Sequence, residues 1–119
     1  MLKKNCLLSM REEPDGLLII LTGEIDHHSA VRVRNEIDAR ICELRPQRAV
    51  MDLSGIDFMD SSGLGLIMGR YSRMRAIGGE LSLRDPAERL LRIFVLAGLE
   101  KMVRIEYTSD SGRENANEK

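Results

Sequence analysis

The apolar residues of this chain follow two periods, one typical of buried strands and one typical of amphipathic helices. Residues 17–22 (Leu-Leu-Ile-Ile-Leu-Thr) are almost continuously apolar, which predicts a strand covered on both faces. Between residues 28 and 44, apolar side chains recur at intervals of three and four, as on one face of a helix. A second helix is predicted over residues 62–77, and the pair Gly78-Gly79 ends it.

The remaining segments complete an alternation of strands and helices. Further strands are predicted at residues 6–11, 48–53, 80–84 and 103–107, with a loop at residues 54–60. A third helix is expected to begin with Asp85 as its N-cap and Pro86 at its first position, and to end at Gly98. The order β-β-α-β-α-β-α-β predicts a single α/β domain with a mixed, mostly parallel sheet and helices packed against it. We place this domain at residues 1–108 and expect residues 109–119 to form a polar, flexible tail.

The composition favours a protein partner over nucleic acid or a membrane. The 119 residues suit one domain, and 18 basic against 19 acidic residues give a net charge of −1. With no basic run, no Trp, two Tyr and two Phe, the chain offers nucleic acid little charge or stacking surface. The longest apolar stretch, Leu17 to Leu21, is far shorter than the roughly 20 residues that span a membrane. We therefore expect a cytoplasmic protein.

Candidates for catalysis or metal binding are weak. His27 and His28 are adjacent, so their side chains point in different directions and make a poor metal pair. The glycines at 63, 65 and 69 have the spacing G-x-G-x-x-x-G and lie inside a predicted helix, unlike a dinucleotide-binding loop. Cys6 and Cys42 lie in apolar stretches and do not form a C-x-x-C pair, so we expect two buried thiols in a reducing compartment. We predict no enzymatic activity, no cofactor and no metal.

Gly65 and Gly69 lie inside a helix, where each glycine costs about 1 kcal/mol of stability relative to alanine. Such a cost indicates that something packs closely against the helix. The sequence leaves open whether this is the sheet beneath or a partner outside.

Ser61 is the strongest candidate for a functional residue. It follows a predicted loop and precedes an apolar helical pattern, so one interpretation is an ordinary helix cap. The same position suits a phosphate, because free N–H groups and the positive end of the helix dipole stabilise an anion there. A phosphoserine would add about −1.5 to −2 charges to a surface that carries Asp60 and Asp26, and so weaken binding to an acidic or apolar partner. Capping alone does not distinguish Ser61 from Ser62.

Four segments occur in a fixed order along the chain. They are Gly23-Glu24-Ile25-Asp26-His27-His28, Met51-Asp52-Leu53, Phe58-Met59-Asp60-Ser61-Ser62-Gly63-Leu64-Gly65 and Gly78-Gly79-Glu80-Leu81. Together they resemble the STAS-domain anti-sigma factor antagonists over about residues 6–107. The His27-His28 pair and the segment Met68-Gly69-Arg70-Tyr71 are most similar to the sporulation branch, which acts in the sigma-F pathway.

The resemblance implies a partner-switching mechanism. In that family the unphosphorylated antagonist binds an anti-sigma factor that is also a serine kinase, and so releases the sigma factor. The kinase phosphorylates the first serine of the D-S-S-G motif, here Ser61, the product dissociates, and a serine phosphatase resets it. The resemblance also selects Ser61 over Ser62. It places the partner contacts at Glu24, Asp26, Asp60, Ser61, Ser62, Gly63 and Gly65.

Two other classes of function remain as alternatives. A STAS-like scaffold subunit of a sensory assembly, or the tail of an anion transporter, is disfavoured because the sequence contains no transmembrane span or sensor domain. A small hydrolase that uses Ser61 or Ser62 is disfavoured because neither serine lies in a G-x-S-x-G nucleophile elbow.

Overall fold

The structure is a computed structural model, and it describes residues 5–108 of the chain. Its centre is a five-stranded sheet in which the strands follow one another in chain order. The strands are β1 (Leu7–Glu13), β2 (Gly16–Ile25), β3 (Arg48–Met59), β4 (Glu80–Arg84) and β5 (Arg104–Glu106). Because β1 is antiparallel to β2 and every other neighbouring pair is parallel, the predicted mixed sheet is confirmed. The tail predicted at residues 109–119 lies outside the described residues.

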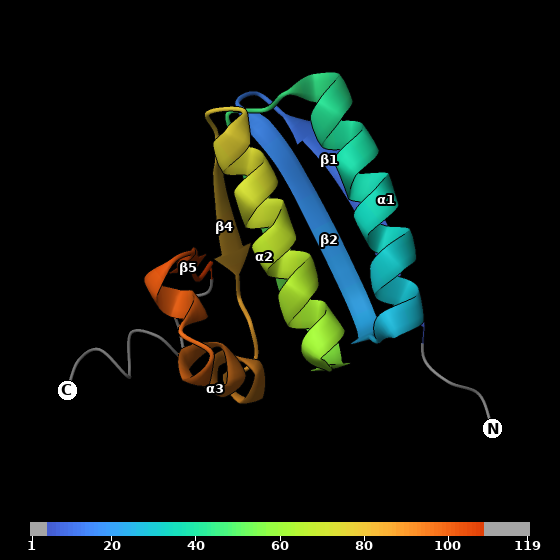
Figure 1. Cartoon of the computed structure of the whole chain (residues 1–119), viewed down its shortest axis with the longest axis vertical. Helices are drawn as coiled ribbons and strands as arrows, with labels where there is room; N and C mark the ends of the chain where they lie inside the picture. The colour runs from blue at the N-terminus through green and yellow to red at the C-terminus, as the bar shows by residue number, and fades with distance from the viewer. Residues whose placement is uncertain (1–4, 109–119) are drawn as a thin grey trace.

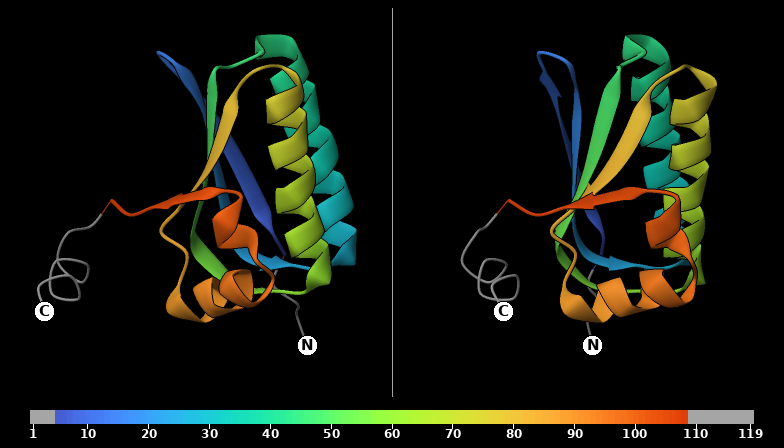
Figure 2. Two further views of the ribbon diagram at one scale, coloured as in Figure 1. Left: turned by 60° about the vertical axis from the view of Figure 1, so that its left-hand side comes forward. Right: turned by 90° about the vertical axis from the view of Figure 1, so that its left-hand side faces the viewer.

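Helices connect the parallel strands. They are α1 (His27–Leu44), α2 (Ser61–Ala76) and α3 (Glu88–Leu96), the last followed by the 3-10 helix η1 (Leu99–Lys101) (Figure 1). The crossovers from β2 to β3 and from β3 to β4 step in the same direction across the sheet, so right-handed connections put α1 and α2 on the same face. Figure 2 shows both long helices on that face, with α3 across one end of the sheet.

The hydrophobic core lies between the sheet and the two long helices. Ile19, Met51 and Leu83 are aligned across β2, β3 and β4, and all three are completely buried. The apolar face of α1 that the sequence predicts supplies Val33 and Ile37 to the same core. This packing fixes where α1 and α2 begin, at the carboxyl ends of β2 and β3.

The opposite face of the sheet is buried only in part. Leu18 and Val50 are aligned on this face and are only 3% and 6% exposed. No helix of the described residues covers them (Figure 2). On this face Glu106 forms ion pairs with Arg48 and Arg84 at 3.9 and 3.3 Å. The prediction that β2 is covered on both faces therefore holds on the helix side, but on the opposite side it holds for Leu18 and not for Ile20 and Thr22, which are partly exposed.

The prediction of a loop at residues 54–60 is wrong. β3 continues to Met59, because β2 continues alongside it to Ile25 and the two backbones pair over this length. The register between them shifts twice, and Gly55 lies beside Thr22 where a Cβ would come within 2.5 Å of the threonine methyl. This part of β3 contains polar residues, so its sequence lacks the apolar pattern that predicts a strand. Backbone pairing with β2 is what stabilises it as a strand.

The predicted start of the third helix is also wrong. α3 begins at Glu88, and its N-cap is Ala87, which makes no side-chain capping bond. Asp85 has a left-handed backbone with φ of 54°. Its carboxylate accepts hydrogen bonds from the Thr108 backbone N–H at 2.9 Å and from the Thr108 hydroxyl at 2.5 Å. This contact between β4 and the end of the described chain holds Asp85 away from a capping position.

The two cysteines differ, which corrects the prediction that both are buried. Cys6 is completely buried whereas Cys42 is exposed on α1. Burial raises the pKa of the Cys6 thiol, an effect that Arg32 opposes and Asp26 reinforces. Cys42 follows the buried Ile41, so the turn of the helix carries its side chain out of the core.

We therefore predict that one thiol of the native protein reacts with Ellman's reagent within minutes and that the other reacts only after unfolding. The thiolate is the reactive species, and Cys6 lacks both exposure and an ordinary pKa. A Cys42→Ser variant should show no fast reaction, whereas a Cys6→Ser variant should keep it. Two fast thiols in the native protein would contradict the assignment.

Candidate functional site

The candidate site lies where β2 and β3 end side by side. Ile25 pairs with Met59 at the last positions of the two strands, and the backbone N–H of Asp60 donates to the Ile25 carbonyl at 3.2 Å. Asp26 and Asp60 are the next residues along each strand, so the two helices α1 and α2 begin next to each other. The site therefore occupies the carboxyl edge of the parallel strands, where α/β proteins commonly place their ligands.

Asp26 begins α1 through a capping box. Its carboxylate accepts from the Ser29 backbone N–H at 2.9 Å, and the Ser29 hydroxyl lies 2.9 Å from the Asp26 backbone N–H, which donates to it. The reciprocal bonds satisfy two N–H groups at the helix start. Asp26 thus has a structural role in the site besides the partner contact that the resemblance implies.

Asp60, and not Ser61, is the N-cap of α2. The Asp60 carboxylate accepts from the Ser62 backbone N–H at 2.8 Å, and the Asp60 carbonyl accepts from Gly63 at 2.9 Å. The interpretation of Ser61 as a helix cap is therefore wrong, because the preceding aspartate occupies that position. Ser61 is the first helical residue and is exposed, and its hydroxyl makes no hydrogen bond within residues 5–108.

We predict that Asp60→Ala lowers the free energy of unfolding by about 1 kcal/mol, while Asp60→Asn changes it by a few tenths at most. Asparagine can still accept the hydrogen bond from the Ser62 N–H, but alanine cannot. Urea unfolding followed by circular dichroism provides the measurement. Equal losses in the two variants would show that charge, rather than capping, is what Asp60 contributes to stability.

The other predicted site residues separate into exposed and internal positions. Glu24 is half-buried and pairs with Phe58 near the ends of β2 and β3. Gly63 is buried, and a Cβ there would come within 2.7 Å of the Met59 sulfur, so close internal packing accounts for this glycine. Gly65 is exposed on α2, where a Cβ would have no neighbouring atom within 4 Å. Of the glycines in the predicted site, only Gly65 is thus open to a partner.

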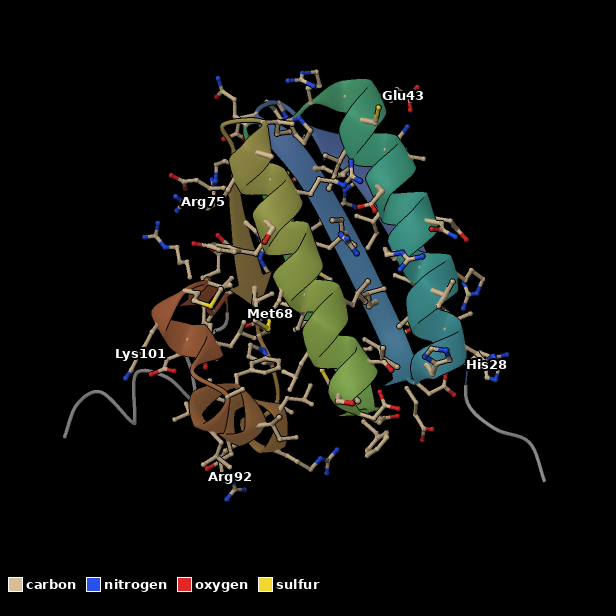
Figure 3. All side chains as sticks on the ribbon, in the orientation of Figure 1. His28, Glu43, Met68, Arg75, Arg92 and Lys101 are labelled. Carbon is tan, nitrogen blue, oxygen red and sulfur yellow. The ribbon has the colours of Figure 1, made fainter. Side chains whose placement is uncertain are left out.

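Exposed apolar side chains lie near the serine. Phe58, three residues before Ser61, is 54% exposed, and Met68, two turns further along α2, is 41% exposed. Figure 3 shows Met68 on the side of α2 that faces away from α1. Phe58 and Met68 are thus apolar side chains that a partner bound to α2 could contact.

The electrostatics of this end of the molecule are mixed. Glu24, Asp26 and Asp60 supply negative charge, whereas the N-termini of α1 and α2 direct their positive dipole ends to the same place. A phosphate on Ser61 would meet the α2 dipole at short range and would need no rearrangement of a buried side chain. It would also make the surface presented to a partner much more negative.

A groove between α1 and α2 begins beside this site, and sequence reasoning missed it. It has a volume of about 380 Å³. We call it the α1–α2 groove, and its lining residues are His27, Ala30, Val31, Arg34, Ser62, Gly65, Leu66, Gly69 and Arg70. One signal was available in the sequence, because Arg70 stands four residues after Leu66 and four before Met74 on the buried face of α2. Such a position predicts a buried guanidinium.

Residues 5–108 contain no cluster of His, Cys, Asp and Glu that could hold a metal ion. Across the same residues, no helix has the length and apolar character needed to cross a membrane.

Comparisons with known proteins agree with this fold. A family model of the STAS domain matches residues 8–112. An anti-sigma F factor antagonist from Paenibacillus polymyxa is 36% identical over 101 residues, which make up 85% of this chain and 86% of that protein. An anti-sigma-B factor antagonist from Bacillus subtilis (strain 168) is 29% identical over 116 residues, or 91% of this chain and 97% of that protein.

Solved structures show the same fold. The anti-sigma factor antagonist SpoIIAA in its unphosphorylated form has a TM-score of 0.76 to this chain at 24% identity, over 92% of this chain and 95% of that one. The Bacillus SpoIIAA in the phosphorylated form has a TM-score of 0.71 at 24% identity, over 92% and 98% of the two chains. The five-stranded mixed sheet and the helices that cover it define a single α/β domain of the STAS type. The chain belongs to the STAS-domain family, in the group of anti-sigma factor antagonists.

Proposed function

We propose that this protein is an antagonist of the sigma-F type, which binds an anti-sigma factor with serine kinase activity and is inactivated by phosphorylation of Ser61. The observation that carries the proposal is the position of Ser61. It is exposed in the first turn of α2, and its hydroxyl makes no hydrogen bond within the described residues. A kinase could therefore reach it, and a phosphate could be added, without breaking an interaction of the fold.

Two features of the comparisons support the sigma-F assignment. The relatives named as anti-sigma F factor antagonists, from Paenibacillus polymyxa and Lysinibacillus sphaericus, are 36% identical to this chain. The relative from Bacillus subtilis that is named as an anti-sigma-B factor antagonist is 29% identical. SpoIIAA has been solved in unphosphorylated and phosphorylated forms, both of which share this fold.

The switch works through charge rather than through refolding. In the unphosphorylated state, Ser61 presents a small neutral group at the start of α2, directly after the capping Asp60 and three residues after the exposed Phe58. Phosphorylation adds about −1.5 to −2 charges at the centre of this surface. A partner that packs against it must then desolvate the phosphate, which opposes binding. A phosphatase that removes the phosphate restores the binding-competent surface.

The proposal is tested by mapping the modification. The anti-sigma factor kinase of the same organism, captured on the unphosphorylated protein and purified, is incubated with this protein and ATP. Tandem mass spectrometry should locate one phosphate, on Ser61. Ser62→Ala, the neighbouring control, should be phosphorylated as the wild type is, and Ser61→Ala should not be phosphorylated. Phosphate found solely at another residue would reject the site.

A further inference from the structure

The α1–α2 groove contains space that the fold does not use. Gly65 and Gly69 line it, and a Cβ at either position would have no neighbouring atom within 4 Å. The sheet beneath therefore does not require these glycines, although glycine lowers helix stability relative to alanine. Of the two explanations that the sequence leaves open, close packing against the sheet is wrong for both residues. What remains is an occupant that does not belong to residues 5–108.

The groove is also lined by more positive than negative charge. Its lining includes Arg34 and Arg70 but no carboxylate. Asp38, the acidic residue next to it, is shared by two guanidinium groups, with Arg70 Nε at 2.9 Å and Arg73 Nε at 3.2 Å from the same Oδ1 atom. Two arginines thus share one carboxylate, and Arg34 is a further positive charge in the groove lining.

Arg70 is the buried member of this cluster. Its side chain is 7% exposed. The contact of Nε with Asp38 has the distance of an ion pair but not the alignment of a hydrogen bond, and Nη1 donates no hydrogen bond within the described residues. Desolvation lowers the pKa of Arg70, Asp38 opposes this, and the nearby Arg73 and Arg34 add to it. A buried donor without an acceptor is unfavourable, so an added anionic group would be stabilised here.

The groove suits an extended or helical segment of a protein. It runs between two helices, and its walls combine apolar side chains such as Val31 and Leu66 with the glycine backbone, so it can accept an apolar side chain. It includes Ser62, so it is continuous with the switch site around Ser61. A partner bound at the helix starts would therefore reach into it.

We propose that the α1–α2 groove binds a segment of the anti-sigma factor that carries an acidic side chain beside an apolar one. The carboxylate pairs with Arg34 and the Arg70 guanidinium, and the apolar side chain fills the space above Gly65 and Gly69. The inference rests on the proposed function for the identity of the partner. It adds a second contact with the partner, separate from Ser61. At this contact the groove is positive and the bound segment is negative.

The first test fills the groove. Gly69→Leu should weaken binding to the captured anti-sigma factor at least tenfold by isothermal titration calorimetry. Ala39→Leu, which adds the same side chain at an exposed α1 position outside the groove, should bind like the wild type. Gly69→Ala should raise the Tm by about 4 °C. This result would show that the fold accepts a side chain at position 69, so a loss of binding in Gly69→Leu with an unchanged circular dichroism spectrum reports a blocked groove.

The second test addresses the charge. Arg34→Glu should weaken binding at least tenfold at low salt and reduce the dependence of affinity on salt, because an attractive charge pair is lost. Lys101→Glu, an equal charge reversal at an exposed position outside the groove, should have little effect.

If Gly69→Leu and Arg34→Glu both bind like the wild type while Ser61→Asp does not, the groove inference is overturned and the proposed function stands. If the wild-type protein binds no anti-sigma factor, both are overturned.

Discussion

Ser61→Asp is expected to weaken binding to the anti-sigma factor about 100-fold while leaving the fold intact. Ser61 is exposed and its hydroxyl makes no hydrogen bond within the described residues, so a carboxylate there removes no internal contact. It lies in the first turn of α2, where the helix dipole favours a negative charge. In the complex, the same charge must lose water against the partner, and a cost of about 2.8 kcal/mol corresponds to 100-fold in affinity.

Two variants serve as controls for this prediction. Ser61→Ala should bind as tightly as the wild type and should stay active in the presence of kinase and ATP, since it cannot be modified. Ser72→Asp introduces the same charge at an exposed serine of the same helix, three turns away, and should change the affinity by less than threefold. Equal weakening by Ser61→Asp and Ser72→Asp would mean that net charge, and not the position of the charge, controls binding.

Asp38→Ala is expected to lower the free energy of unfolding by about 3 kcal/mol. Asp38 is the acidic residue that compensates the buried Arg70, and its side chain is 19% exposed. Removing it leaves a buried guanidinium without a counter-ion between α1 and α2, which is far more costly than losing a surface ion pair. Chemical denaturation monitored by circular dichroism measures the difference.

The matched control lies on the same helix. Glu36 pairs with Arg32 at 3.9 Å, and both side chains are about half exposed, so Glu36→Ala should cost roughly 0.5 kcal/mol or less. Replacing both members of the buried pair, with Asp38→Leu and Arg70→Met, should recover much of the lost stability, because no charge is then left buried. A loss below about 0.5 kcal/mol in Asp38→Ala would contradict the burial of Arg70 as a determinant of stability.

Much of the fold follows from local patterns in the sequence, and two of its exceptions depend on contacts between distant residues. The alternation of strand and helix periods predicts each of the five strands of the sheet and the two long helices that cover it. The second half of β3 was missed because its pairing with β2, and not its own apolar pattern, holds it extended. Asp85 has the local signature of a helix cap, but its contact with Thr108, which is distant in sequence, gives it another conformation.

The candidate site also has features that the local sequence predicts and features that depend on the tertiary structure. Asp60, Ser61 and Ser62 are adjacent in sequence, so their place at the start of a helix could be predicted without a structure. The proximity of Asp26 to this helix start could not, because it depends on the pairing of Ile25 with Met59. The α1–α2 groove depends on how two helices pack, and neither glycine of its wall signals by itself that the space above it is open.

The most direct test of the account is whether phosphorylation of Ser61 controls release of a sigma factor. A fluorescently labelled sigma factor is bound to the anti-sigma factor, and its anisotropy is followed while this protein is added. The unphosphorylated protein should displace the sigma factor at stoichiometric concentration, and the protein phosphorylated on Ser61 should require about 100-fold more, as the like-charge and desolvation costs predict. Displacement by both forms at the same concentration would contradict the account.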